Sequence, residues 1–134
     1  MTPSIDIRNA IVEALGLQED IHIAFLFGSA ARNRLRPDSD VDIAVAGSRP
    51  LSIDEMMSTT RRLSQAVRRE VDLVDLRVTE GLILREILTK GTALIVHDRG
   101  FLVALAKKVV YFSEDLLPYT QRLRQSRIER FIHA

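Results

Sequence analysis

Two aspartates one residue apart, inside an apolar run, constrain this chain more than any other feature. The segment SDVDIAVA, residues 39–46, alternates as a β-strand does, so Asp40 and Asp42 share one face and the apolar residues form the core side. Two like charges this close repel, and desolvating each is costly unless a cation compensates. Mg²⁺ is a natural compensator, because it takes oxygen ligands and suits a pair of carboxylates plus substrate phosphates. The segment therefore predicts a strand that carries part of a metal site.

A third carboxylate comes from a later strand. The segment EVDLVDL, residues 70–76, again places acidic residues in an apolar run. Asp72 lies in the middle of this strand and shares a face with Val74, whereas Asp75 points the other way, nearer the strand end, where water can reach it. We therefore expect Asp72 to be the third metal ligand and Asp75 to be a solvated or capping residue.

Ten residues separate a Gly-Ser pair, Gly28 and Ser29, from the first of these aspartates. It follows IHIAFLF, residues 21–27, which predicts a strand covered on both faces. Gly28 would let the backbone come close to a ligand, and the following amides with the Ser29 hydroxyl would form a phosphate cradle. Taken alone, the pair is explained more simply by a tight turn in which Ser29 caps a helix.

The rest of the chain predicts helices that lie on a sheet. Helices are expected at residues 4–15, 52–69, 79–91 and within 101–134, and a fourth strand at 92–98. Ser52 and Glu55 form a capping box at the start of the second helix, and Pro118 interrupts the last segment. This order predicts an α/β (α+β) domain, with a small mixed β-sheet and flanking helices.

Composition limits the classes of protein to which the chain can belong. With 134 residues, 46% of them hydrophobic, it can form one domain with one core. A net charge of +1 predicts neither disorder nor general nucleic-acid binding. The chain has no cysteine, which excludes disulfides and cysteine zinc sites. No apolar run is long enough for a membrane span, and charges near the start argue against a signal peptide, so we expect a soluble, cytoplasmic protein.

These features occur together in one known family. The segment GSAARNRLRPDSDVDIAV, residues 28–45, resembles the GS-x10-D-x-D motif of the polymerase-β-like nucleotidyltransferase superfamily. It is most similar to the minimal nucleotidyltransferase, or MNT, branch, and REVDLVDL, residues 69–76, looks like the third-aspartate strand of that family. The resemblance implies a nucleotidyltransferase fold over residues 1–100. Residues 101–134 would then be a helical C-terminal extension of the same domain.

The resemblance also implies a chemistry, namely two-metal transfer of AMP from ATP. Asp40 and Asp42 would hold two Mg²⁺ ions and through them the nucleotide, and Asp72 would complete the ion that activates the acceptor. Mn²⁺ is a possible substitute. The Gly-Ser pair would hold the β- and γ-phosphates. Arg32 matches the family arginine and would contact the triphosphate, although a salt bridge to a neighbouring acid explains it equally well.

The acceptor and the partner are implied by the resemblance alone. Small MNT proteins are commonly antitoxins paired with a HEPN-domain RNase toxin, and they transfer AMP to a tyrosine of that toxin. We expect the part of the C-terminal segment before Pro118 to lie on the protein's own sheet, and residues 119–134 to be a candidate for docking a partner helix. Nucleic-acid binding is not directly indicated. Two alternatives stay open: a small-molecule (aminoglycoside-like) nucleotidyltransferase, and a non-catalytic protein that neutralises a toxin by contact.

Overall fold

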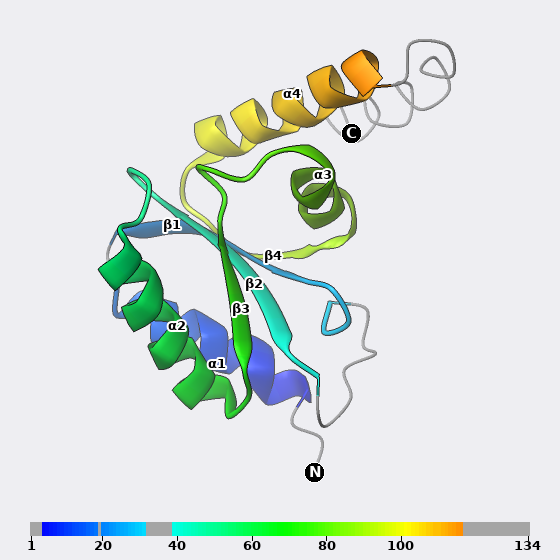
Figure 1. Cartoon of the computed structure of the whole chain (residues 1–134). Helices are drawn as coiled ribbons and strands as arrows, with labels where there is room; N and C mark the ends of the chain where they lie inside the picture. The colour runs from blue at the N-terminus through cyan, green and yellow to red at the C-terminus, as the bar shows by residue number, and fades with distance from the viewer. Residues whose placement is uncertain (1–3, 19, 32–38, 117–134) are drawn as a thin grey trace.

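A computed structural model describes residues 4–18, 20–31 and 39–116, in which helices and strands follow one another in the order α-β-β-α-β-α-β-α (Figure 1). The strands are β1 (Ile21–Phe27), β2 (Val41–Gly47), β3 (Val71–Asp75) and β4 (Thr92–Val96). The helices are α1 (Ser4–Gly16), α2 (Ile53–Val67), α3 (Gly81–Lys90) and α4 (Arg99–Leu116). None of the helices in these residues is both long and apolar enough to cross a membrane.

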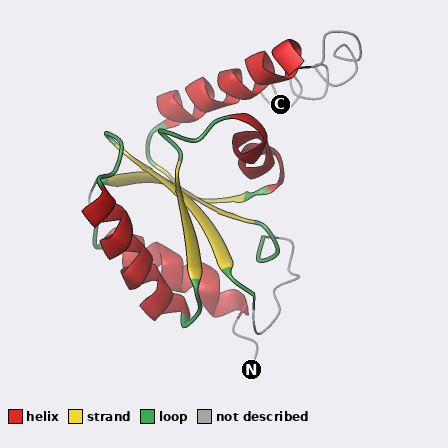
Figure 2. Cartoon of the chain, viewed as in Figure 1, coloured by secondary structure: helices red, strands yellow, loops and turns green. Residues whose placement is uncertain are grey.

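The strands form one mixed sheet in the order β3-β2-β1-β4 (Figure 2). β1 is antiparallel to both of its neighbours, whereas β2 and β3 are parallel. Parallel neighbours need a long crossover connection, and α2 supplies it. Because the two strands run the same way, the first residues of β2 and of β3 lie side by side at one edge of the sheet.

Helices cover both faces of this sheet, α1 and α2 on one face and α3 and α4 on the other (Figure 1). Side chains of β2 alternate between the two layers. Val41, Ile43 and Val45 lie in the core with α1 and α2, while Ala44 and Ala46 lie in the core with α3 and α4. The expectation of a single core side was therefore wrong, because the face that carries the aspartates is itself buried further along the strand.

The predicted types of helix and strand are confirmed within the described residues, although their ends differ. β1 has the predicted bounds, and β2 begins at Val41, so Asp40 stands just before the strand. The capping box is present: the Glu55 amide donates to Ser52 Oγ at 3.1 Å, and the Ser52 amide donates to the Glu55 carboxylate at 2.8 Å. Pro118 and the predicted docking segment lie outside the described residues.

Candidate active site

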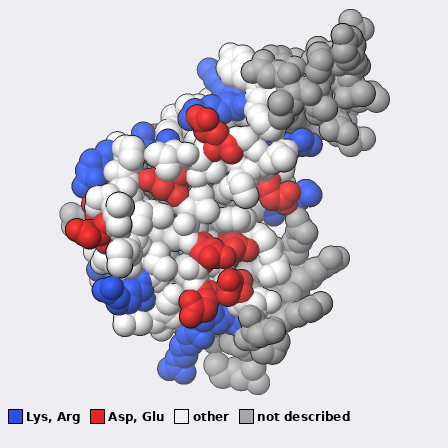
Figure 3. All heavy atoms as spheres, in the orientation of Figure 1, with Lys and Arg blue, Asp and Glu red and all other residues white. Residues whose placement is uncertain are grey.

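Asp42 and Asp72 face each other across two parallel strands. They are direct partners in the register of β2 and β3, so their side chains leave the sheet on the same face. Their carboxylates lie close enough for the negative charge of Asp72 to act on Asp42, and the charge of Asp40 acts on Asp42 as well. Figure 3 shows acidic side chains gathered over the lower part of these strands. The structure thus brings together the three carboxylates that the sequence predicted.

Burial and the repulsion of neighbouring charges destabilise the ionised form of Asp42. Burial raises the pKa of Asp42 most, and the negative charges of Asp72 and then Asp40 raise it further. Oxygen ligands with surplus negative charge are the donor set that a hard divalent cation takes. In the described parts of the chain, however, no three Asp, Glu or His side chains are placed to hold a metal ion. Carboxylates are the right chemical type of donor for a divalent cation, and Asp42 and Asp72 lie on one face of the sheet. Their side chains are nevertheless not arranged as a metal site in this structure.

Gly28 turns the chain directly beside these carboxylates. Its φ is +70°, in the left-handed region that favours glycine, and it follows Phe27, the register partner of Asp42. A Cβ on Gly28 would overlap the Oδ2 atom of Asp42. Residues 28–31 form a turn, in which Ser29 is partly exposed. Gly28 therefore lies against the Asp42 carboxylate; its backbone conformation favours glycine, and a larger residue there would have to displace that carboxylate.

Two further predictions concern Arg32 and Asp75. Arg32 lies outside the described residues. Asp75 is 5% exposed, and its carboxylate accepts the backbone N–H groups of Leu51 at 2.8 Å and Arg77 at 2.9 Å. The capping role is confirmed, whereas the expectation of a solvated side chain was wrong. Asp75 shares its face with Val71 and Leu73, which pack with the core under α1 and α2, and this alternation could have predicted its burial.

Sequence reasoning missed the turn that joins α2 to β3. Arg69 Nη1 donates to the carbonyl oxygen of Ser39 at 3.5 Å, and the amide of Val41 donates to the carbonyl oxygen of Glu70 at 2.9 Å. Both bonds reach the segment around Asp40. The residues that each bond joins are about thirty positions apart in the sequence. A local sequence pattern cannot indicate a contact over that separation.

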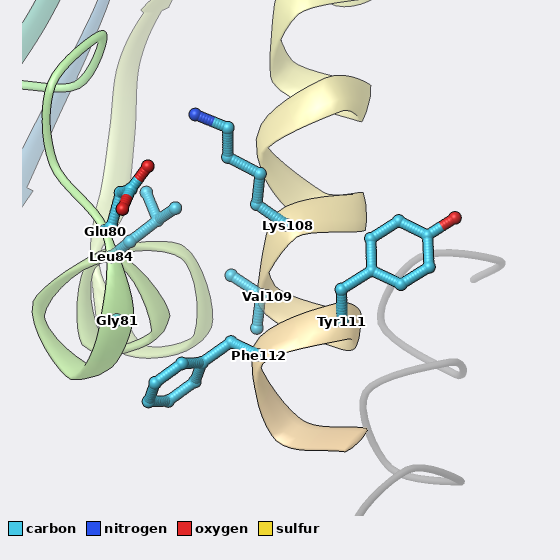
Figure 4. A pocket seen from close by; sticks show the side chains of 7 residues that line it. All are labelled: Glu80, Gly81, Leu84, Lys108, Val109, Tyr111 and Phe112. Atoms are coloured by element: carbon cyan, nitrogen blue, oxygen red, sulfur yellow. The ribbon is translucent and has the colours of Figure 1, made fainter. Parts of the chain in front are cut away.

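A hollow of about 510 Å³ lies between the start of α3 and the end of α4 (Figure 4). Its lining consists of apolar side chains with one charge of each sign: Glu80, Gly81, Leu84, Lys108, Val109, Tyr111 and Phe112. None of the candidate active-site residues that the structure describes contributes to it. The hollow is therefore separate from the carboxylate site.

Comparison with known families identifies the family of this chain. Residues 9–100 match the family described as polymerase beta nucleotidyltransferase. The chain belongs to this family. The match covers every strand of the sheet and all three carboxylates. The resemblance that the Gly-Ser and Asp-x-Asp motif indicated is thereby confirmed for this nucleotidyltransferase.

Two individual proteins are similar to this chain, one over about half of its length and the other over most of it. The protein adenylyltransferase MntA of Shewanella oneidensis is 31% identical to this nucleotidyltransferase over 74 residues, 55% of this chain and 53% of the relative. The match thus spans about half the length of MntA. A crystal structure of a toxin-antitoxin with AMP-PNP has a TM-score of 0.72 and 26% identity, covering 92% of this chain and 96% of that chain.

A third relative supports the fold. It is a structure of a tri-AMPylated Shewanella oneidensis HEPN toxin in complex with an MNT antitoxin. It has a TM-score of 0.68 and 24% identity, and the likeness covers 95% of this chain and 97% of that chain. At this identity the likeness bears on the fold alone.

Proposed function

We propose that this nucleotidyltransferase is a metal-dependent protein adenylyltransferase that acts as an antitoxin. It would transfer AMP from ATP to a hydroxyl of a cognate toxin, in the cytoplasm, and the acceptor would be a tyrosine of a HEPN RNase. The observation that carries the proposal is the register of Asp42 opposite Asp72, with Asp40 and Gly28 beside them. The name of the relative MntA and the AMP-PNP bound by a related toxin-antitoxin support it.

The carboxylates would bind two Mg²⁺ ions, or Mn²⁺ in their place. Asp40 and Asp42 would hold both ions, and Asp72 would complete the one nearer the acceptor. When bound, such ions lower the pKa of the acceptor hydroxyl and neutralise charge on the phosphates. As register partners, Asp42 and Asp72 would supply oxygen atoms from one face of the sheet, and the exposed Asp40 would add its own from just before β2.

The transfer itself is a displacement at the α-phosphorus of ATP. The acceptor oxygen attacks, a new P–O ester bond forms, and the bond to the β-phosphate oxygen breaks, which releases pyrophosphate. The acceptor proton leaves to solvent, so no histidine or lysine base is needed. The turn at Gly28 and Ser29 would hold the β- and γ-phosphates through backbone N–H groups and the Ser29 hydroxyl, and Arg32 would contact the triphosphate. Positioning and charge neutralisation would supply most of the catalysis.

Labelled ATP tests this proposal directly. The full chain is incubated with Mg²⁺, ATP labelled on its α-phosphate, and the toxin encoded beside it. The label is expected on the toxin with the wild type and to fall below detection with Asp42→Asn or Asp72→Asn. Asp54→Asn, an exposed carboxylate in the first turn of α2, is the matched control and should keep full labelling.

Other outcomes identify the alternatives. Label retained by Asp42→Asn would rule out this site. Label found on a small molecule would assign the chain to the small-molecule enzymes. Stable complex formation with the toxin, without any label, would leave only neutralisation by contact.

A further inference from the structure

The turn between α2 and β3 holds the chain on both sides of Asp40. Ser39 and Val41 flank this aspartate. The guanidinium of Arg69 donates to the Ser39 carbonyl at 3.5 Å, and the Glu70 carbonyl accepts the Val41 amide at 2.9 Å. The second bond continues the pairing of the sheet. The first replaces sheet pairing at Ser39, which stands before β2 begins.

The backbone of this turn directs Arg69 toward the site. α2 ends at Val67, and its C-cap residue Arg68 has a φ of +57° and donates its N–H to the Ser64 carbonyl at 2.8 Å. A left-handed residue at this place reverses the chain after the helix. The side chain of Arg69 is then partly buried, and Asp72 follows three residues later. One short turn therefore contacts the chain on both sides of Asp40 and leads into the strand that carries Asp72.

We propose that Arg69 is a positioning residue for the metal-binding carboxylates. The inference rests on the proposed function. Arg69 would act through the Ser39 backbone, which it holds so that Asp40 stays on the face of Asp42 and Asp72, and it would contact neither nucleotide nor acceptor. Residues one shell away from a metal ligand commonly set metal affinity in this way.

The charge of Arg69 predicts the opposite effect, so the two roles can be separated. Figure 3 shows basic side chains directly below the acidic group. If Arg69 acted only as a nearby positive charge, it would repel a divalent cation, and its removal would tighten metal binding. If Arg69 positions Asp40, its removal loosens one ligand and weakens metal binding. The sign of the change in affinity therefore distinguishes the two roles.

The experiment compares Arg69→Gln with Arg68→Gln in the full chain. Both variants remove one positive charge from the same turn, but no hydrogen bond links the exposed Arg68 side chain to Ser39. Mn²⁺ binding without nucleotide is measured by electron paramagnetic resonance, and kcat and KM are measured for AMP transfer. Arg69→Gln is expected to weaken Mn²⁺ binding about tenfold and to lower kcat more than it changes KM for ATP. Arg68→Gln should bind Mn²⁺ as the wild type does, or more tightly.

Further variants and a melting curve complete the design. Arg69→Lys keeps a donor for the Ser39 carbonyl and should recover most of the affinity. If Arg69→Gln does not fold, Arg69→Met gives the same comparison, because it keeps the apolar stem and removes the donor. Mn²⁺ binding in a folded Arg69 variant that equals or exceeds that of Arg68→Gln would overturn the inference. A wild type that binds no metal and transfers no AMP would instead defeat the proposed function.

Discussion

Asp42 is the residue at which stability and function oppose each other. Burial and two neighbouring carboxylates raise its pKa, so the folded protein holds the Asp42 proton more tightly than the unfolded chain does. The cost of ionising Asp42 is therefore present at neutral pH and disappears as the pH falls through the raised pKa toward the ordinary range. Under the proposed function, the same negative potential would attract a divalent cation.

Replacing Asp42 should consequently stabilise the metal-free protein. We expect Asp42→Asn to raise the Tm at pH 7 by a few degrees, because partial exposure screens the charges and limits the gain. Scanning calorimetry across pH should show the gap narrowing as the pH falls, because the wild type then regains its proton. Mg²⁺ should reverse the order by stabilising the wild type alone. A Tm below that of the wild type at pH 7 without metal would contradict this account.

Gly28 is restricted by its backbone and by its neighbour. We expect Gly28→Ala to lose at least about 1 kcal/mol of unfolding free energy, because alanine is disfavoured at a φ of +70° and its Cβ would displace the Asp42 carboxylate. AMP transfer should fall by about a hundredfold or more, since a displaced ligand forfeits several kcal/mol of metal catalysis. Gly16→Ala, which has open space around it, is the control in urea unfolding and transfer assays. Equal effects at the two glycines would refute this explanation.

At the scale of the element, β3 carries two aspartates with opposite tasks. Asp72 points to the carboxylate site, while Asp75 ties the end of the strand to the residues that precede α2 through the amide of Leu51. Alternation along the strand predicted which of them would face Asp42. It could not predict the partners of Asp75, because the loop before α2 reaches it only in the folded chain.

The two aspartates of β3 should therefore give crossed phenotypes. Asp75→Ala leaves the amides of Leu51 and Arg77 without their acceptor and should cost about 2 kcal/mol of unfolding free energy, while the folded fraction keeps its activity. Asp72→Ala should change stability by less than about 0.5 kcal/mol, because the side chain is exposed, yet abolish transfer. Urea unfolding and labelled-ATP assays on both variants test the contrast. A loss of activity per folded molecule in Asp75→Ala would assign that residue to the site instead.

The types of the elements could be predicted because each has a local cause. Apolar alternation marked β2 and β3, and Ser52 with Glu55 marked the start of α2. The order of the strands could not be predicted in the same way, because no residue of β2 indicates which strand will lie beside it. The parallel pairing depends on how α2 crosses the sheet, and that is decided by the core as a whole.

Across the whole molecule, two hydrophobic layers hold the sheet. α4 belongs to the second layer, where Leu105 is fully buried with Phe25 and Ile87. This fits the expectation that the chain before Pro118 lies on its own sheet. Composition could predict enough apolar residues for a core, but it could not reveal that the core is divided by the sheet.

The second layer should contribute strongly to stability. We expect Leu105→Ala to lower the unfolding free energy by about 2–5 kcal/mol, because it leaves a cavity in a closed core. Val103→Ala lies on the same helix, 49% exposed, and should stay within about 0.5 kcal/mol of the wild type. Urea unfolding of the full chain measures both. Similar small losses for the two variants would mean that α4 is not part of the cooperative fold.

The parallel register of β2 and β3 makes the carboxylate site depend on the exact number of residues in the turn before β3. One residue inserted or deleted between Arg68 and Val71 would shift β3 by a single step against its neighbour. Asp72 would then turn inward beneath α1 and α2, and an aliphatic side chain would stand opposite Asp42. A residue gained after Asp75 causes no such inversion. Length variation among natural chains of this kind is therefore expected beyond the far end of β3, and strict conservation of length in the tight bend before it.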